Sequence, residues 1–129
     1  MKPISVILID AAITFTLVAR YIFEAYHTQQ FCLIGTTTID QEAIQLVHDT
    51  QPELALVDFH DPGIQVIGKI RQVWPSLVVL VLGNSGESIY HSLALRAGAS
   101  DYGSKQQLNR LLDAYLAKRR GGEFSNNGG

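Results

Sequence analysis

The chain has 129 residues, and 47% of them are hydrophobic, which suits a single domain with a buried core. Lys and Arg (10) nearly balance Asp and Glu (12), so the net charge of −2 excludes a general attraction to nucleic acid or to anionic membranes. No apolar run approaches the length of a membrane span, and the N-terminus lacks the apolar region of a signal peptide. We therefore expect a soluble cytoplasmic domain that makes no direct contact with nucleic acid or membrane.

The cysteine content supports the same compartment. Cys32 is the only cysteine, so an internal disulfide is excluded and a reducing cytosol is the natural environment. Its neighbours in the stretch QFCLIG are apolar. This surrounding predicts a buried, unreactive thiol.

The first half of the chain alternates between strand-like and helix-like patterns. Residues 4–9 form a continuous apolar run, which is typical of a parallel strand covered on both faces. From Ile13 onward the apolar residues recur at helical spacing, which predicts the first helix. The next expected elements are a strand at 30–35, a helix within 36–52 and a strand at 54–57.

The second half continues the alternation. The stretch LVVLVL at 77–82 is the strongest strand signal in the chain. The other expected elements are helices at 64–74, 87–97 and 106–118 and a short strand at 99–102. Five strands alternating with five helices predict an α/β fold, in which a doubly wound parallel sheet carries helices on both faces. We expect one domain at 1–120, followed by a flexible linker or tail at 121–129.

Three charged residues follow predicted strands. Asp10 ends the first strand, Asp58 ends the third, and Lys105 comes shortly after the fifth. Because the carboxyl ends of parallel strands meet at one edge of the sheet, we expect the two carboxylates to lie close together. Mg²⁺ takes oxygen ligands and often uses only one or two carboxylates. A carboxylate beside Mg²⁺ can attack phosphorus, and the Lys105 ammonium could pair with a carboxylate or a phosphoryl oxygen.

At this point the chain resembles the receiver domain of two-component response regulators. The resemblance covers residues 4 to about 118 and is carried by VILID, LALVDFHDPG, LVVLVLGNSGES and RAGASDYGSK. It implies a flavodoxin-like (βα)5 fold, a five-stranded parallel sheet in the order 2-1-3-4-5. By position, Asp58 matches the phospho-acceptor, Asp10 matches an acidic metal-site residue, and Lys105 matches the lysine that pairs with the phosphoryl group. Tyr102 matches the aromatic residue that changes rotamer on activation, and His60 stands where receivers donate a backbone carbonyl to the metal.

The chain departs from the receiver pattern at several positions. Ala11 replaces the second of two consecutive acids that contact the metal, so the resemblance implies weak Mg²⁺ binding and no other cofactor. Gly83 replaces the Ser or Thr that bonds the phosphoryl oxygen and couples it to the aromatic residue. The loop after HDPG is about three residues shorter than in typical receivers, and Gln106 replaces the proline that usually follows the lysine.

The individual residues also allow simpler interpretations. Asp58 could cap the backbone of the HDPG turn, as aspartate commonly does. Asp10 could instead form an internal ion pair with Lys105, without any metal. For both residues the functional and the structural interpretation remain open from the sequence.

The leading functional hypothesis is an atypical receiver domain, a signalling module and not an enzyme, that acts largely without phosphorylation. Its expected partners are a histidine kinase and a DNA-binding output domain outside this chain, with regulation of transcription as the outcome. The resemblance also implies a homodimer through the face of the fourth helix, fifth strand and fifth helix. The alternative is a conventional Mg²⁺-dependent receiver phosphorylated on Asp58. A nucleotide- or flavin-binding enzyme would need a phosphate loop after the first strand, and DAAITF does not supply one.

Overall fold

The computed structural model describes residues 2–27, 29–60 and 63–121. The strands are β1 (Ile4–Ile9), β2 (Phe31–Thr37), β3 (Leu54–Asp58), β4 (Val78–Gly83) and β5 (Asp101–Ser104). The helices are α1 (Ile13–Tyr26), α2 (Asp40–Thr50), α3 (Ile67–Val73), α4 (Ser88–Arg96) and α5 (Leu108–Arg120). The 3₁₀ turns η1 (Gly63–Val66) and η2 (Lys105–Gln107) precede α3 and α5. Most of the expected linker, 122–129, lies outside the described residues, as do Asp61 and Pro62 of the HDPG turn.

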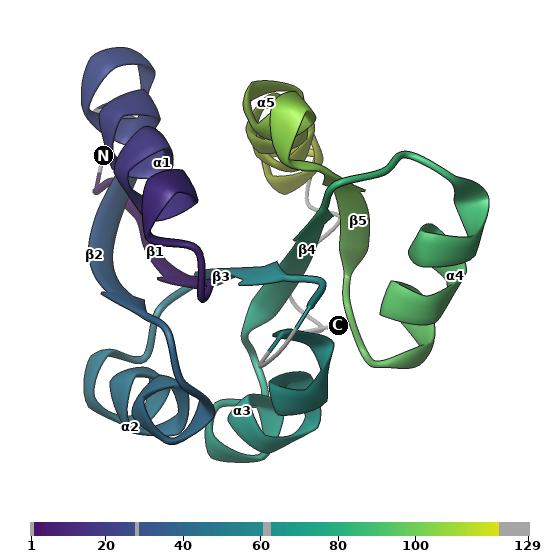
Figure 1. Ribbon diagram of the computed structural model, residues 1–129. Helices are drawn as coiled ribbons and strands as arrows, with labels where there is room; N and C mark the ends of the chain where they lie inside the picture. Colours follow the sequence, from purple (N-terminus) through teal and green to yellow (C-terminus); the bar gives the residue numbers. More distant parts are fainter. Residues whose placement is uncertain (1, 28, 61–62, 122–129) are drawn as a thin grey trace.

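The five strands form one parallel sheet in the order β2-β1-β3-β4-β5. Helices α1 and α5 cover one face of this sheet, and α2 and α3 cover the other (Figure 1). Helix α4 lies beside β5 and packs on the same side as α2 and α3. The predicted fold class and strand order are confirmed. The order in which strands are added to the sheet reverses between β1 and β3. In such sheets, ligands bind at the carboxyl ends of the strands beside this point.

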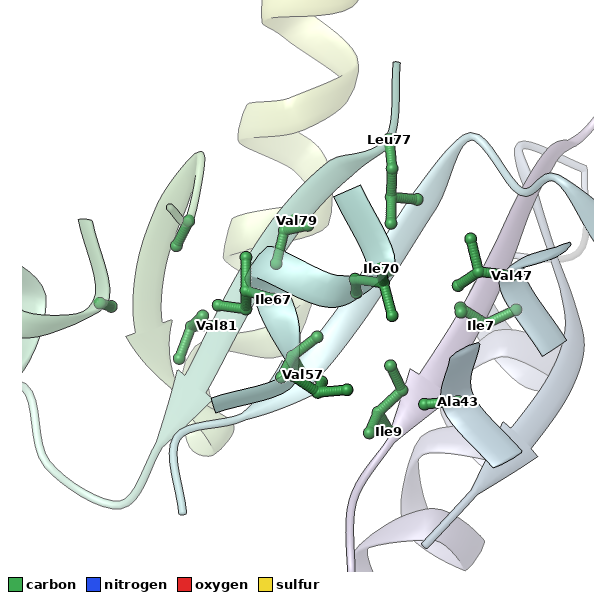
Figure 2. Packing of buried hydrophobic residues seen from close by; sticks show 14 of the residues in the cluster. Ile7, Ile9, Ala43, Val47, Val57, Ile67, Ile70, Leu77, Val79 and Val81 are labelled. Atoms are coloured by element: carbon green, nitrogen blue, oxygen red, sulfur yellow. The ribbon is translucent and has the colours of Figure 1, made fainter. Parts of the chain in front are cut away.

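Each face of the sheet has its own apolar core. Figure 2 shows the core on the α2 and α3 side, where strand residues such as Ile7, Val57 and Val79 meet Val47 and Ile70 from the helices. All five of these side chains are fully buried. Burial of an aliphatic side chain contributes about 1.5–3 kcal/mol. The continuous apolar runs of the sequence are therefore explained by strands that are covered on both faces.

The last strand begins two residues later than expected, at Asp101 and not at Ala99. Ser100 nevertheless joins the chain to β4, because its amide donates a hydrogen bond to the Val79 carbonyl at 2.7 Å and its hydroxyl accepts one from the Val79 amide at 3.2 Å. Arg71 donates to the same hydroxyl and to the backbone carbonyl of Gly98. The sequence pattern could not distinguish this bridge, which uses one backbone and one side-chain hydrogen bond, from a regular strand.

The prediction of a buried Cys32 is wrong. Cys32 is exposed and lines an open groove of about 230 Å³ between α1 and β2. Strand β2 lies at the edge of the sheet, and its burial is incomplete along most of its length. Apolar neighbours in sequence therefore did not guarantee burial, because they lie on an edge strand that the helices only partly cover.

Candidate functional site

The candidate site lies at the carboxyl end of the sheet, where three strands end side by side. Asp10 directly follows β1, Asp58 is the last residue of β3, and Lys105 directly follows β5. Asp58 is in register with Leu82, and Gly83 is in register with Ser104, so β3, β4 and β5 end at nearly the same level. The parallel topology thus brings together three residues that are far apart in sequence, as predicted.

Lys105 lies between the two carboxylates. Its Nζ is 2.8 Å from Asp10 Oδ2 and 3.1 Å from Asp58 Oδ1. The side chains of Asp10 and Asp58 are 1% and 8% exposed, and that of Lys105 is 17% exposed. Among the described residues, these two buried oxygens meet no donor other than the Lys105 ammonium. The lysine is therefore the internal cation of the site.

The other oxygen of Asp10 serves the backbone. Asp10 Oδ1 accepts a hydrogen bond of 2.7 Å from the Ala12 amide, just before α1 begins. The Asp10 amide donates to the Thr37 carbonyl at 3.0 Å, which ties the residue to the end of β2. Asp10 thus has two structural partners, the Lys105 ammonium and the Ala12 amide just before α1. The negative charge of Asp10 stabilises both contacts.

The charges of the site perturb one another. The pKa of Asp58 is raised, first by burial and then by the nearby Asp10 charge, while Lys105 opposes the rise. Burial by itself would lower the pKa of Lys105, but its contacts with Asp10 and Asp58 outweigh that effect and raise it. Two carboxylates share one ammonium, so the site carries an excess of negative charge. Such an arrangement attracts a further cation or a proton.

A divalent cation finds only part of a site here. The carboxylates of Asp10 and Asp58 are oxygen donors of the kind that Mg²⁺ binds. Ala11 is exposed and offers no side-chain oxygen, and the imidazole of His60 is exposed. Within the described parts of the chain, no three His, Cys, Asp or Glu side chains gather to hold a metal ion. Asp10 and Asp58 fit Mg²⁺ as donors, but the Lys105 ammonium already contacts both of them.

An aromatic ring completes the surroundings of Lys105, and the sequence analysis did not identify it. The Lys105 ammonium lies 4.6 Å from the centre of the Phe15 ring, within the range of a cation–π contact. Phe15 is in the first turn of α1 and is half-buried. Its place close to the strand-end Asp10 was visible in the sequence, but its orientation toward the lysine was not.

The second part of the site is the pair of Gly83 and Tyr102. Tyr102 is buried, with 8% of its surface exposed, and its hydroxyl donates a hydrogen bond to the Ser85 carbonyl. A Cβ atom on Gly83 would lie 2.2 Å from Tyr102 Oη and 2.9 Å from Cζ. The tyrosine ring therefore occupies the volume that any larger residue at position 83 would need. The absence of a side chain at Gly83 is what admits the ring.

Other aromatic residues hold Tyr102 in place. The Phe59 ring lies 6.1 Å from the Tyr102 ring and 5.2 Å from the Tyr90 ring, both in edge-on arrangements. His91 lies 6.3 Å from Tyr102, and its Nε2 is 3.4 Å from Asp101 Oδ1. Because Phe59 directly follows Asp58, this aromatic cluster connects the carboxylate site to α4 and β5.

Glycine is also required beside Asp58. A Cβ atom on Gly63 would lie 2.1 Å from the backbone carbonyl oxygen of Asp58. Gly63 begins the turn η1, so the chain returns close to the end of β3 before α3 starts. The shortened loop noted in the sequence therefore depends on a residue without a side chain at this point.

No helix in the described parts of the chain is long and apolar enough to span a membrane. The basic residues 118–120 lie in the last turn of α5, where cations suit the helix dipole. There Arg119 pairs with Glu53 at the start of the sheet, with Arg119 Nη2 3.1 Å from Glu53 Oε1.

Sequence comparison identifies bacterial transcriptional regulators as relatives. An uncharacterized transcriptional regulatory protein of Bacillus subtilis, YhcZ, is 33% identical over 98 residues, which cover 71% of this chain and 44% of that protein. A putative transcriptional regulator of Pseudomonas aeruginosa is 29% identical over 116 residues, which cover 87% of this chain and 55% of that protein. The chain thus spans about half the length of these curated relatives. No family model matches the chain.

Solved structures identify the fold. A LuxR-family two-component response regulator from Aurantimonas matches with a TM-score of 0.76 and 23% identity, over 90% of this chain and 86% of that one. The Salmonella typhimurium response regulator RcsB matches with a TM-score of 0.77 and 21% identity, over 95% of this chain and 62% of that one. The chain is therefore a doubly wound α/β domain. More narrowly, its fold is that of response regulator receiver domains, and its sequence is related to transcriptional regulators, so the resemblance noted above is confirmed.

Proposed function

We propose that this chain is an atypical receiver domain whose signalling face keeps one conformation whether or not Asp58 is phosphorylated. It acts as a binding module in transcriptional regulation and not as an enzyme. The observation that carries the proposal is the packing of Tyr102 into the space beside Gly83. A switch needs two conformations that the signal stabilises to different extents.

Gly83 lacks the side-chain group that such a switch would need at this position. A hydroxyl at this position could form a hydrogen bond to a phosphoryl group on Asp58. Forming that bond would move the hydroxyl relative to the aromatic residue. Gly83 has no group that could form this bond, and the inward Tyr102 is already held by the Ser85 carbonyl. A phosphoryl group would therefore have little differential contact with two positions of Tyr102.

The charged residues Asp10, Asp58 and Lys105 also support the proposal. Lys105 already contacts both Asp10 and Asp58, and Ala11 contributes no oxygen to a metal site. Buried carboxylates without a cation would be strongly unfavourable, so Lys105 gives the two residues a structural role in the absence of any signal. We infer weak Mg²⁺ binding through Asp10, Asp58 and the backbone carbonyl of His60.

A conventional receiver is the second candidate. The observation in its favour is the contact of Lys105 with Asp58, because the ammonium is in position to pair with a phosphoryl oxygen on that residue. In this case a histidine kinase would phosphorylate Asp58, and Mg²⁺ would neutralise the incoming phosphate. The two candidates share the same acceptor and differ in whether phosphorylation changes the face of α4, β5 and α5.

The partners follow from the relatives. We propose that residues 1–120 form the receiver-like domain, that 121–129 lead toward an output domain outside this chain, and that this output domain binds DNA. The face of α4, β5 and α5 would contact a partner, and homodimerisation through it stays a prediction. Exposed apolar residues on α4, Ile89 and Leu93 among them, support a contact there. A cytoplasmic location suits this function.

Intact mass spectrometry tests the proposal. The chain is incubated with acetyl phosphate and Mg²⁺, and an Asp58→Asn variant provides the control. Phosphoryl transfer would form a bond between phosphorus and an Asp58 carboxylate oxygen and release acetate, which adds one labile phosphoryl group to the mass. Hydrogen exchange of peptides covering 84–104 is measured in the same samples. No adduct, or an adduct with unchanged exchange, supports the proposal, and an adduct that alters exchange in the native chain alone contradicts it.

A further inference from the structure

The open groove beside Cys32 lies between α1 and the edge strand β2, which are neighbours in Figure 1. Its lining comes from the second half of α1, the first residues of β2 and the residue before β1. These segments lie at the amino end of the sheet, whereas Asp10 and Asp58 lie where their strands end. The groove is therefore separate from the candidate functional site.

The volume of the groove limits the size of what it can hold. An apolar cavity of about 150 Å³ is enough to bind benzene. Sites for drug-sized molecules begin at about 300 Å³. The groove measures about 230 Å³ and falls between these two values. It therefore suits a small molecule that carries one ring or one branched aliphatic group.

The base of the groove is apolar. Phe23 from α1 is 3% exposed and Phe31 from β2 is 1% exposed, and their rings pack edge to face with centroids 5.9 Å apart. Leu33, one step further along the same side of β2, is half-buried against the same core. An apolar group that covers these side chains leaves water, which favours binding in proportion to the area covered.

Two opposite charges line the same groove. Arg20 and Glu24 are exposed and lie one turn apart on α1. On an ordinary helix surface such residues simply pair with each other across the turn. In the part of the chain that the structure describes, neither side chain forms an ion pair or a hydrogen bond, with the other or with any third residue. A cation and an anion thus meet at an apolar groove without charged partners of their own.

We propose that this groove binds a free α-amino acid with an aromatic or branched aliphatic side chain. The carboxylate of the ligand pairs with the Arg20 guanidinium, which suits two-point recognition of a carboxylate. The ammonium of the ligand pairs with Glu24, and its side chain covers Phe23 and Phe31. At pH 7 an amino acid carries both charges on neighbouring atoms, so one small molecule complements both residues. A simple carboxylic acid or amine would leave one of the two charges without a partner.

A second groove at the amino end of the sheet lacks this combination. Its volume is about 70 Å³, and the charged residues that line it are Lys2, Arg119 and Arg120. A space of that size holds only a few water molecules, each of which takes about 30 Å³. Its charged lining offers cations and no carboxylate, so it suits neither an aromatic ring nor an ammonium. Opposite charges above an apolar base are therefore a property of the larger groove.

NMR titration of the native chain with L-phenylalanine tests the proposal. We expect a dissociation constant of about 1 mM or lower, the range for a small ligand in an open groove. The ¹H–¹⁵N shifts should be largest in residues 20–24 and 31–33. L-Leucine should bind with similar affinity. L-Serine, which lacks the apolar side chain, should bind at least about tenfold more weakly.

Ligands that lack one charge separate the two ion pairs. L-Phenylalaninamide has no carboxylate, and 3-phenylpropionate has no ammonium. We expect each to bind the native chain about fivefold more weakly than phenylalanine does, since both protein charges are exposed. Arg20→Gln should abolish the preference for phenylalanine over the amide and keep the preference over 3-phenylpropionate. Glu24→Gln should show the reverse pattern.

Matched variants control for the loss of charge alone. Arg110→Gln and Asp113→Asn each remove one charge from an exposed position of α5, outside the lining of the groove. Both should bind phenylalanine as tightly as the native chain does. Thermal unfolding checks that all four variants remain folded, which we expect because every substituted residue is exposed.

The outcomes either support the proposal or overturn it. Exchange of the ligand preferences between Arg20→Gln and Glu24→Gln supports it. The absence of any shift at about 10 mM phenylalanine overturns it, as does equal affinity for N-acetyl-L-phenylalaninamide, which carries neither charge. Shifts centred on Phe59 and Tyr102 also overturn it, because binding then occurs elsewhere. None of these results depends on phosphorylation of Asp58, so they test this proposal separately from the function proposed above.

Discussion

The two ends of the candidate site differ in how much of a receiver they retain. At the end of β1 and β3, Asp10, Asp58 and Lys105 meet within hydrogen-bonding distance. At the end of β4, Gly83 lacks any side chain, and Tyr102 fills the space beside it. The first region places two carboxylates around one ammonium, and the second offers no side-chain group at position 83.

The two regions therefore meet separate physical requirements. A buried aspartate needs a cation for folding, so Asp10, Asp58 and Lys105 stabilise one another with or without a phosphate. A hydroxyl at position 83 would have no such structural role, and the absence of a side chain there gives the Tyr102 ring the space in which it is buried. In the function we propose, the carboxylate site is therefore kept for folding and is not coupled to the face of α4, β5 and α5.

Removal of the internal cation should have the largest effect. Lys105→Met would leave Asp10 and Asp58 facing each other without compensation. We expect the free energy of unfolding at pH 7 to fall by about 3 kcal/mol, toward the lower limit for a broken buried pair because Lys105 is partly exposed. Urea denaturation measures the change. An effect below that of a typical surface substitution would mean that the three charges are not coupled.

The same variant predicts a dependence on pH. In the native protein the pKa of Asp58 is already raised by burial and by Asp10, and the loss of Lys105 would raise it further. A raised pKa in the folded state means that the folded protein binds more protons than the unfolded chain, so stability increases as pH falls. Lys105→Met should therefore recover part of its lost stability between pH 7 and pH 5. A further loss of stability between pH 7 and pH 5 would contradict the role of Lys105 as the cation that compensates Asp10 and Asp58.

Restoring a side chain at position 83 should have the next largest effect. In Gly83→Thr the new Cβ would collide with the Tyr102 hydroxyl, and the ring must leave its place. We expect a loss of about 1–3 kcal/mol, the usual cost of overpacking, together with greater exposure of Tyr102. Urea denaturation gives the first quantity, and quenching of tyrosine fluorescence by acrylamide gives the second.

A double variant provides the control for that clash. If Tyr102 is the group that collides, then Gly83→Thr should cost much less in a Tyr102→Ala background than in the native chain. The difference between the two costs is the coupling energy of the pair, which we expect to reach about 1 kcal/mol or more for residues in direct contact. If the stability costs of the two substitutions simply add, the position of the Tyr102 ring does not depend on the absence of a side chain at Gly83.

The hydroxyl of Tyr102 should matter less than its ring. Tyr102→Phe keeps the ring beside Gly83 and removes only the hydrogen bond to the Ser85 carbonyl. We expect a loss of about 1 kcal/mol, the typical net value of one such bond. Thermal unfolding measures it, and Tyr90→Phe serves as a matched change in the same aromatic cluster. A larger loss in the control than in the Tyr102 variant would contradict the role given to this bond.

The smallest effect on stability should come from Ala11→Asp. The position is exposed, so the substitution should change the free energy of unfolding by less than about 0.5 kcal/mol without metal. An added carboxylate beside Asp10 and Asp58 should nevertheless strengthen Mg²⁺ binding by roughly tenfold, because ligand charge sets such affinities. Isothermal titration with Mg²⁺, with Ala11→Asn as the uncharged control, measures the gain. Equal affinities for the native chain and the Asp variant would contradict the view that Ala11 limits the metal site.

The sequence predicted the parts of this molecule that depend on chain order and repeated patterns. Alternation of apolar runs and helical spacing led to the five-stranded fold, and strand ends located Asp10, Asp58 and Lys105 at one edge. The interpretation of Asp10 as the partner of Lys105 was also available before the structure. These features follow from topology, which constrains backbone positions more tightly than side-chain directions.

The missed features depend on side-chain directions and on coverage by other elements. Phe15 over Lys105 and Tyr102 beside Gly83 require rotamers that no spacing encodes. The exposure of Cys32 reflects the place where an edge strand lacks a covering element. Apolar periodicity says that a residue could be buried, but only the packed structure says whether something covers it.

The most direct test follows the Tyr102 ring itself. The chain is labelled with fluorotyrosine, the Tyr102 resonance is assigned from the Tyr102→Phe variant, and ¹⁹F spectra are recorded before and after treatment with acetyl phosphate and Mg²⁺. Asp58→Asn provides the control. We expect the Tyr102 resonance to keep its buried position in both proteins, even if mass spectrometry finds an adduct on Asp58. A shift of that resonance in the native chain alone would contradict the separation of the acceptor site from the signalling face.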